Sequence, residues 1–307
     1  MKIIPNENII PSKIDSVQVE KNLEGFSQLL EEIRNFGSFV IENVFNNNEI
    51  DDYVRLVTSC LLRQIIELLD ATAILIKKSS SEPCNLLIRG LFESYLFIKF
   101  LLEKNSKERA KVYYVCYFMK KREWEEKRDP ASIAGEKLQE KLINDGYSDE
   151  HFSNQNSKTE IEKIDQILKN PLFDKIISKY KLFKKKPHWY TLFTGYQNLY
   201  ELAEKLKCST HYDILYKYFS EYAHSEKTLE NIDARNKGEV GIEKIRNPEN
   251  AQSNFQTAST FAMESYHTVI LNLIPKMEET FLQWYKENIS PSISQILNKQ
   301  LIEVIRS

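Results

Sequence analysis

The chain has 307 residues, with only eight glycines and nine prolines, and a formal net charge of −2 at pH 7. So few glycines and prolines favour helices, because helix interiors tolerate these two residues least. A net charge near zero argues against non-specific nucleic-acid binding by the protein as a whole, although it leaves room for a local basic site.

The four cysteines, Cys60, Cys84, Cys116 and Cys208, are far apart and form no Cys-x-x-Cys motif. We expect free thiols in a reducing compartment. The first residues, MKIIPNENIIPSK, interrupt each short apolar stretch with a proline, which argues against a signal peptide. The most apolar run, 95–102, contains Lys99 and is too short to cross a bilayer. The expectation is a cytoplasmic protein with no membrane partner.

Apolar residues recur at helical spacing through the first part of the chain and predict helices over about 19–45 and 49–77. The next stretch, EPCNLLIRGLFESYLFIKFLLEK, is apolar on nearly all sides, which is typical of the buried centre of a bundle. A fourth helix is predicted from about 105 to 128, and Asp129-Pro130 marks its end.

Residues 130–186 are polar and weakly periodic, which predicts shorter helices. A helix follows over about 209–224, then a long loop over 225–250 in which a small hairpin around 238–245 is one option. A long helix over about 251–286 and a shorter one close the chain. The pattern predicts a single all-α domain over 1–307, a helical bundle with a long central apolar helix. Its core is about 20–128 and 187–290, and the insertion of about 129–186 forms a polar helical cap.

Arg89 and Glu93 are four residues apart in the central helix, so they share one face and can form an ion pair. Leu86, Leu96, Phe97 and Phe100 flank this face, so both charges are expected to be desolvated. A structural ion pair is one interpretation. The other makes Arg89 a catalytic or anion-binding residue that Glu93 orients.

Tyr216, Ser220 and His224 follow one another at four-residue spacing and therefore share a helix face. No Gly-x-Ser-x-Gly elbow surrounds Ser220, so a serine nucleophile has little support. His224 is either a helix C-terminal cap, where a partly cationic imidazole suits the helix dipole, or a catalytic proton carrier.

Together these motifs resemble an uncharacterised bacterial family, domain of unknown function 5677. The matching positions are Arg89 and Glu93 on one helix, Trp189 before a helix, and Tyr218, Ser220 and His224 near a helix end. The resemblance covers roughly residues 50–270 and implies no activity. It implies that Arg89, Glu93 and His224 belong to one site, so we predict that they converge in space.

A metal site is an alternative. Glu221-x-x-His224 and Glu264-x-x-His267 are two Glu-x-x-His pairs, and Glu67 and Glu93 lie on other predicted helices. Such a set resembles the ligands of ferritin-like di-iron bundles. However, a guanidinium beside a metal is electrostatically unfavourable, and Glu93 neighbours Arg89. No cofactor is therefore expected.

The stretch KYKLFKKKPHWY alternates lysines with aromatic residues, a composition that suits a phosphate backbone and single-stranded bases. A solvated loop with aromatic residues packed into a core would look the same. The residues assigned here as candidate ligand-binding positions are Tyr114, Trp189, Tyr216, Tyr218, Lys185 and Lys186.

Three functions remain open. The first is a metal-independent ribonuclease-like protein, similar in architecture to the helical HEPN toxins and defence effectors, with Arg89, Glu93, Ser220 and His224 as catalytic residues. The chain departs from the HEPN pattern, because no arginine lies five residues before a histidine within one motif. The second is a non-enzymatic binding or regulatory module for an anionic ligand, and the third is the di-metal bundle. The expected partners are RNA or another phosphate-bearing ligand, with a homodimer as a further option.

Overall fold

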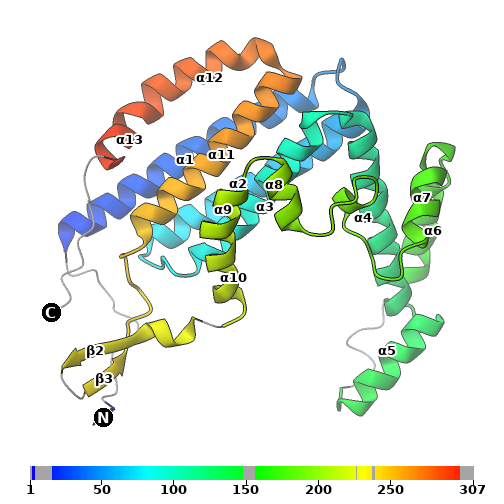
Figure 1. Ribbon diagram of the computed structural model, residues 1–307, viewed down its shortest axis with the longest axis horizontal. Helices are drawn as coiled ribbons and strands as arrows, with labels where there is room; N and C mark the ends of the chain where they lie inside the picture. Colours follow the sequence, from blue (N-terminus) through cyan, green and yellow to red (C-terminus); the bar gives the residue numbers. More distant parts are fainter. Residues whose placement is uncertain (1, 4–15, 148–155, 226, 237–238, 298–307) are drawn as a thin grey trace. The chain divides into compact units, whose positions relative to one another are not determined.

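The computed structural model describes residues 2–3, 16–147, 156–225, 227–236 and 239–297 (Figure 1). The chain is all-α apart from one small sheet, as predicted. It forms two compact units, one from 1–104 with 202–307 and the other from Asn105–Glu201. The second unit therefore begins before the predicted insertion of about 129–186 and ends after it. Within the described residues, no helix is long and apolar enough to cross a membrane.

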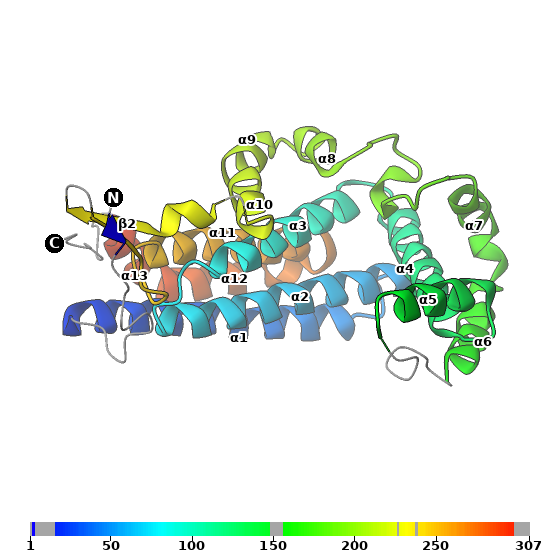
Figure 2. The ribbon, with the colours of Figure 1, turned by 90° about the horizontal axis from the view of Figure 1, so that it is seen from below.

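Four helices pack side by side in the first unit: α1 (Val17–Phe45), α2 (Asp52–Lys77), α3 (Cys84–Glu103) and α11 (Ala251–Leu273) (Figure 2). Side-chain caps begin two of them, since Ser16 Oγ accepts a hydrogen bond from the Val19 amide and Asp51 Oδ1 accepts one from the Tyr53 amide. The boundaries lie within three residues of those expected for α1 to α3. The helical periodicity was thus a reliable guide to this bundle.

The interior of the bundle is aromatic. Phe26 of α1 stacks on Phe255 of α11 with ring centroids 5.0 Å apart, and both are buried. Tyr266 of α11 is fully buried, and Gly37 of α1 faces it so closely that an added Cβ would lie 2.3 Å from the Tyr266 hydroxyl oxygen. A glycine is therefore required where α1 and α11 approach each other.

The predicted helix over 251–286 is wrong as one continuous element. Helix α11 ends at Leu273, and a short 3₁₀ turn, Pro275–Met277, precedes α12 (Glu278–Trp284). Pro275 explains the break, because proline lacks an amide proton and disfavours a helical conformation in the residue before it. A π-helical segment, Tyr285–Ile289, then leads into α13 (Ser290–Leu297).

The helix predicted over 209–224 consists of three parts: α9 (Ser209–His211), a π-helical segment (Tyr212–Tyr216) and α10 (Lys217–Ala223). The preceding helix is α8 (Leu199–Lys205). Helix α10 packs against α3, the helix that carries Arg89 and Glu93. This packing positions the candidate site.

The small sheet follows this region. A 3₁₀ turn, Thr228–Asn231, leads into β2 (Ile232–Asn236), which pairs antiparallel with β3 (Glu239–Ile242) and confirms a hairpin in the predicted loop. Strand β1 (Lys2–Ile3) pairs parallel with β3, so the strand order is β1-β3-β2.

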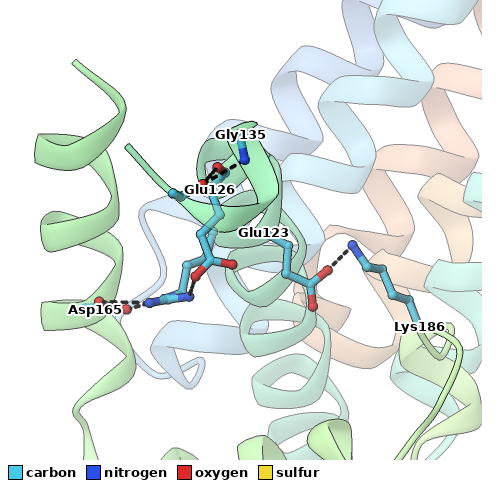
Figure 3. A network of polar contacts seen from close by, with 7 residues as sticks. Glu123, Glu126, Gly135, Asp165 and Lys186 are labelled. Atoms are coloured by element: carbon cyan, nitrogen blue, oxygen red, sulfur yellow. Dashed lines mark hydrogen bonds and ion pairs between the residues drawn. The ribbon is translucent and has the colours of Figure 1, made fainter. Parts of the chain in front are cut away.

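In the second unit, α4 (Ser106–Arg128) contacts α5 (Ile133–Asn144), α6 (Ser157–Leu168) and α7 (Asp174–Lys181). These are the shorter helices that the polar sequence predicted. Ion pairs from α4 hold this unit together (Figure 3): Arg122 Nε lies 2.6 Å from Asp165 Oδ1 of α6, and Glu123 pairs with Lys186.

Candidate functional site

A polar cluster joins α3 to the π-helical segment of the first unit. Arg89 Nε lies 3.4 Å from Glu93 Oε1, which confirms the predicted i, i+4 pair. The Tyr216 hydroxyl accepts a hydrogen bond from Arg89 Nη2 at 2.9 Å and donates one to Glu93 Oε1 at 2.9 Å. The Arg89 guanidinium carbon also lies 4.7 Å from the centre of the Tyr216 ring. Three side chains from two distant segments thus form one closed network.

The cluster is less buried than its sequence context predicted. The side chains of Arg89 and Glu93 keep 27% and 34% of their surface exposed. Leu86, which was expected to help desolvate the pair, is itself 48% exposed, because it lies at the outer edge of α3. The pair is therefore half-buried and open to a ligand from solvent.

Burial and charge both act on Tyr216. Burial, followed by the nearby Glu93 carboxylate, raises the pKa of Tyr216 to about 12, so the phenol stays protonated and can donate. For Arg89, burial lowers the pKa, but the hydrogen bond to Tyr216 and the charge of Glu93 outweigh it, and the net pKa is raised. The site is thus a fixed cation beside a neutral phenol and a carboxylate.

Ser220 lies one turn beyond Tyr216, and its hydroxyl donates to the Tyr216 carbonyl oxygen at 2.7 Å. A serine bonded to the preceding turn of its own helix is a common arrangement without chemical consequence. The Ser220 proton is directed at the backbone and not at an imidazole. The geometry therefore gives no Ser220–His224 dyad.

His224 is the C-cap residue of α10, and its backbone amide donates to the Ser220 carbonyl oxygen at 3.1 Å. Its side chain is exposed and makes no hydrogen bond or ion pair with any residue in the part of the chain that the structure describes. It shares the α10 face with Tyr216 and Ser220 but does not join the Arg89 network. Convergence of His224 with Arg89 and Glu93 stays a prediction.

The other side of α10 holds a lysine that the sequence reasoning missed. Lys227 Nζ lies 3.7 Å from the centre of the Tyr218 ring and forms ion pairs with Glu221 at 3.2 Å and Glu230 at 2.8 Å. The i, i+4 spacing of Tyr218 and Tyr222 was the available signal for this aromatic surface. Tyr218, proposed as a ligand-binding residue, therefore already contacts a cation of its own chain.

The remaining candidate ligand-binding residues belong to the second unit. Trp189 is buried, and the centre of its ring lies 5.1 Å from that of Tyr113. The ring centres of Tyr114 and Phe118 are 4.7 Å apart. For Trp189 this burial agrees with the second interpretation of its stretch, in which the aromatic residues pack into a core. Lys186 pairs with Glu123 (Figure 3), whereas Lys185 is exposed.

The residues of the di-metal alternative do not assemble. Glu93 belongs to the Arg89 network, Glu221 pairs with Lys227, and His267 stacks on Phe281 with centroids 5.2 Å apart. No group of three His, Cys, Asp or Glu side chains that could hold a metal ion occurs among the described residues. The Glu-x-x-His spacing alone is a weak signal, because any helix with many glutamates contains it by chance.

A hollow of about 530 Å³ lies elsewhere in the first unit, between the end of α1 and the turn after α11. Phe39, Glu42, Asn46 and Lys276 are among the residues that line it. It contains none of the predicted site residues.

Comparison with known proteins places the chain in a family. No curated protein and no solved structure gives a match. The model of the family of unknown function DUF5677 matches residues 55–239, which include Arg89, Glu93, Tyr216 and His224. This match covers more than half of the chain, and the chain therefore belongs to the family of unknown function DUF5677.

Proposed function

We propose that the chain is a ribonuclease-like cytoplasmic protein that cleaves RNA without a metal ion, with Arg89 holding a phosphate and His224 carrying a proton. One observation carries this proposal. Glu93 and Tyr216 fix the Arg89 guanidinium, while its Nη1 has no hydrogen bond to any residue within the described ranges. A guanidinium held in this way offers its remaining donors in one direction, and these donors suit a phosphate oxygen.

The position of His224 favours a polymeric ligand. His224 lies eight positions after Tyr216, so their Cα atoms are about 12 Å apart along the helix axis. Arg89 bonds the Tyr216 hydroxyl, so an RNA strand whose phosphate Arg89 holds can extend along this helix face toward His224. The exposed imidazole would then lie beside the strand that Arg89 holds.

An imidazole in this place supplies the chemistry of metal-free RNA cleavage. It accepts the proton of a ribose 2′-hydroxyl, and the 2′-oxygen attacks the adjacent phosphorus. The bond from phosphorus to the 5′-oxygen breaks, and the imidazolium returns the proton to that oxygen. The products are a 2′,3′-cyclic phosphate and a 5′-hydroxyl, and Arg89 holds the strand in place through a neighbouring phosphate.

The test uses a labelled single-stranded RNA and a DNA of the same base sequence, both in EDTA. We expect cleavage of the RNA alone, because only RNA carries the 2′-hydroxyl. His224→Ala should abolish cleavage with little change in melting temperature, while His267→Ala should retain it. Cleavage that survives His224→Ala, or that EDTA stops, would contradict this mechanism.

The second candidate, a non-enzymatic module that binds an anionic ligand, has its own support. The Glu93 carboxylate already balances the charge of Arg89, the Ser220 hydroxyl bonds only the Tyr216 backbone carbonyl, and the His224 ring makes no hydrogen bond to the network among the described residues. In this case the same RNA should bind and remain intact. Arg89→Ala should then weaken binding, while His224→Ala should leave it unchanged.

A further inference from the structure

A basic and aromatic surface lies on the second unit, apart from the residues of the Arg89 network. Its lysines come from α7 and the segment that follows it: Lys175, Lys179, Lys181, Lys184 and Lys185. All five belong to described residues, and no Asp or Glu side chain forms an ion pair with them there. In a chain with a net charge of −2, five unbalanced lysines within eleven positions form a local positive field.

Phe193 lies beside two of these lysines, Lys175 and Lys179. The Nζ atom of Lys179 is 4.6 Å from the centre of the Phe193 ring, and that of Lys175 is 6.0 Å away. Phe193 nevertheless keeps 42% of its surface exposed, and Phe183 keeps the same fraction. The structure therefore places one exposed aromatic ring, that of Phe193, beside two ammonium groups.

We propose that this surface of the second unit binds single-stranded RNA, with Phe193 stacking on a base and the α7 lysines contacting the phosphates. Stacking on a ring requires an unpaired base, and a row of lysines follows a backbone without reading its sequence. The occupant is therefore a single strand and not a duplex. The inference shares only the kind of ligand with the proposed cleavage site, and it can hold whether or not RNA is cleaved.

The structure also defines which lysines take part. Lys186 pairs with Glu123 of α4 (Figure 3), so it is excluded, although the sequence grouped it with its neighbours. Lys175 precedes the basic run and is added because of its place beside Phe193. The proposed binding surface thus omits Lys186 and includes Lys175, unlike the sequence motif KYKLFKKKPHWY.

The experiment measures binding of a labelled single-stranded oligouridylate to the full chain carrying His224→Ala, so that the RNA remains intact. The test variant carries three substitutions on the surface, and the control carries three at exposed lysines of α5 and α6 with the same change in net charge. The test substitutions are Lys175→Ala, Lys179→Ala and Lys184→Ala, and the control substitutions are Lys137→Ala, Lys141→Ala and Lys158→Ala. In the test variant, the slope of log affinity against log salt should fall by about 2, since each phosphate contact on a single strand contributes roughly 0.7.

Phe193→Leu keeps the charge and removes the ring, so it should weaken binding about tenfold, the usual effect of losing one stacked base. The matching RNA duplex should bind more weakly than the single strand, because its paired bases cannot stack on Phe193. Equal losses in the test and control variants would overturn the proposal, because net charge alone would then explain binding. So would an unchanged affinity in Phe193→Leu, or a test variant that loses binding to phosphatidylserine vesicles but not to RNA.

Discussion

Tyr216 is the residue that joins the two opposite charges of the candidate site. Its hydroxyl accepts from the arginine and donates to the glutamate, so each of its hydrogen bonds involves a charged partner. Hydrogen bonds of this kind contribute about 1.5–3 kcal/mol each, more than those between neutral groups. The Tyr216 hydroxyl therefore does much to hold the side chains of Arg89 and Glu93 in place.

The shifted pKa of Tyr216 predicts a pH dependence of stability. The unfolded chain loses this proton at the ordinary pKa of 10, whereas the folded protein keeps it to about pH 12. The stability that Tyr216 contributes is thus fully present below pH 10 and falls as the pH rises toward about 12. Urea unfolding of the wild type and Tyr216→Phe should show a difference in the free energy of unfolding that shrinks over this range. A difference that grows with pH would contradict the assignment.

Removing Glu93 should cost less than it would in a fully buried pair. Glu93→Ala leaves both Arg89 and Tyr216 without one partner, but solvent reaches the pair and can compensate in part. We expect a loss of about 1–2 kcal/mol in the free energy of unfolding. The control is Glu103→Ala, an exposed glutamate at the end of the same helix, with an expected change within about 0.5 kcal/mol. Equal melting temperatures for the two variants would show that the network contributes nothing to stability.

At the scale of the elements, α1 and α11 approach each other more closely at Gly37 than any other two helices do at a described glycine. An added Cβ at Gly37 would meet the Tyr266 hydroxyl, and Tyr266 has no space to move because it is fully buried. That hydroxyl also has no hydrogen-bond partner among the described residues. Close packing and an unsatisfied polar atom therefore occur at the same place.

Two substitutions there should act in opposite directions. Gly37→Ala should lower the free energy of unfolding by about 1–3 kcal/mol, because the overpacking exceeds the gain in helix propensity. Tyr266→Phe should raise it by about 1 kcal/mol, because it removes a buried hydroxyl without a partner. Chemical denaturation of both single variants and the double variant tests the pair. The double variant should be more stable than the sum of the single effects predicts, and strict additivity would mean that the two positions do not touch.

At the scale of the whole molecule, burial is distributed unevenly among the helices. Most of the length of α3 is buried, including Leu91, Leu96 and Leu101 at 0% exposure. In α5 only Gly135 is buried, while Ile133 and Ile143 are 74% and 60% exposed. Local stability should follow this contrast, because helices with few buried side chains open at low cost.

Hydrogen–deuterium exchange measures that contrast directly. The amides of α2, α3 and α11 should be the slowest to exchange, and those of α5 should be among the first. The comparison is internal to one sample, so it needs no variant. Equally slow exchange in α5 and α3 would mean that α5 is covered in solution by something outside the described chain.

The sequence predicted the bundle well because the periodicity of apolar residues directly reports which helix faces are buried. It also predicted the Arg89–Glu93 pair, since a spacing of four residues is a local property of a helix. It did not predict that Tyr216 lies between them, because that contact joins residues 127 positions apart and depends on how α10 packs on α3. The exposed fraction of Arg89 was misjudged for the same reason. Neighbours in sequence do not show which side of a helix stays open.

The π-helical segment at Tyr212–Tyr216 has a consequence for how the chain can vary in length. A residue added to or removed from an ordinary helix rotates everything after it by about 100°, which would turn a face that packs on a neighbouring helix away from that neighbour. A π segment already contains one extra residue within a helix, and such segments are frequent at functional sites. Loss of one residue inside it, for example the exposed Ile214, would leave a regular α-helix with Lys217–Ala223 still facing α3. The site can thus tolerate the loss of one residue within Tyr212–Tyr216, whereas the same loss within Lys217–Ala223 would separate His224 from the face that Tyr216 defines.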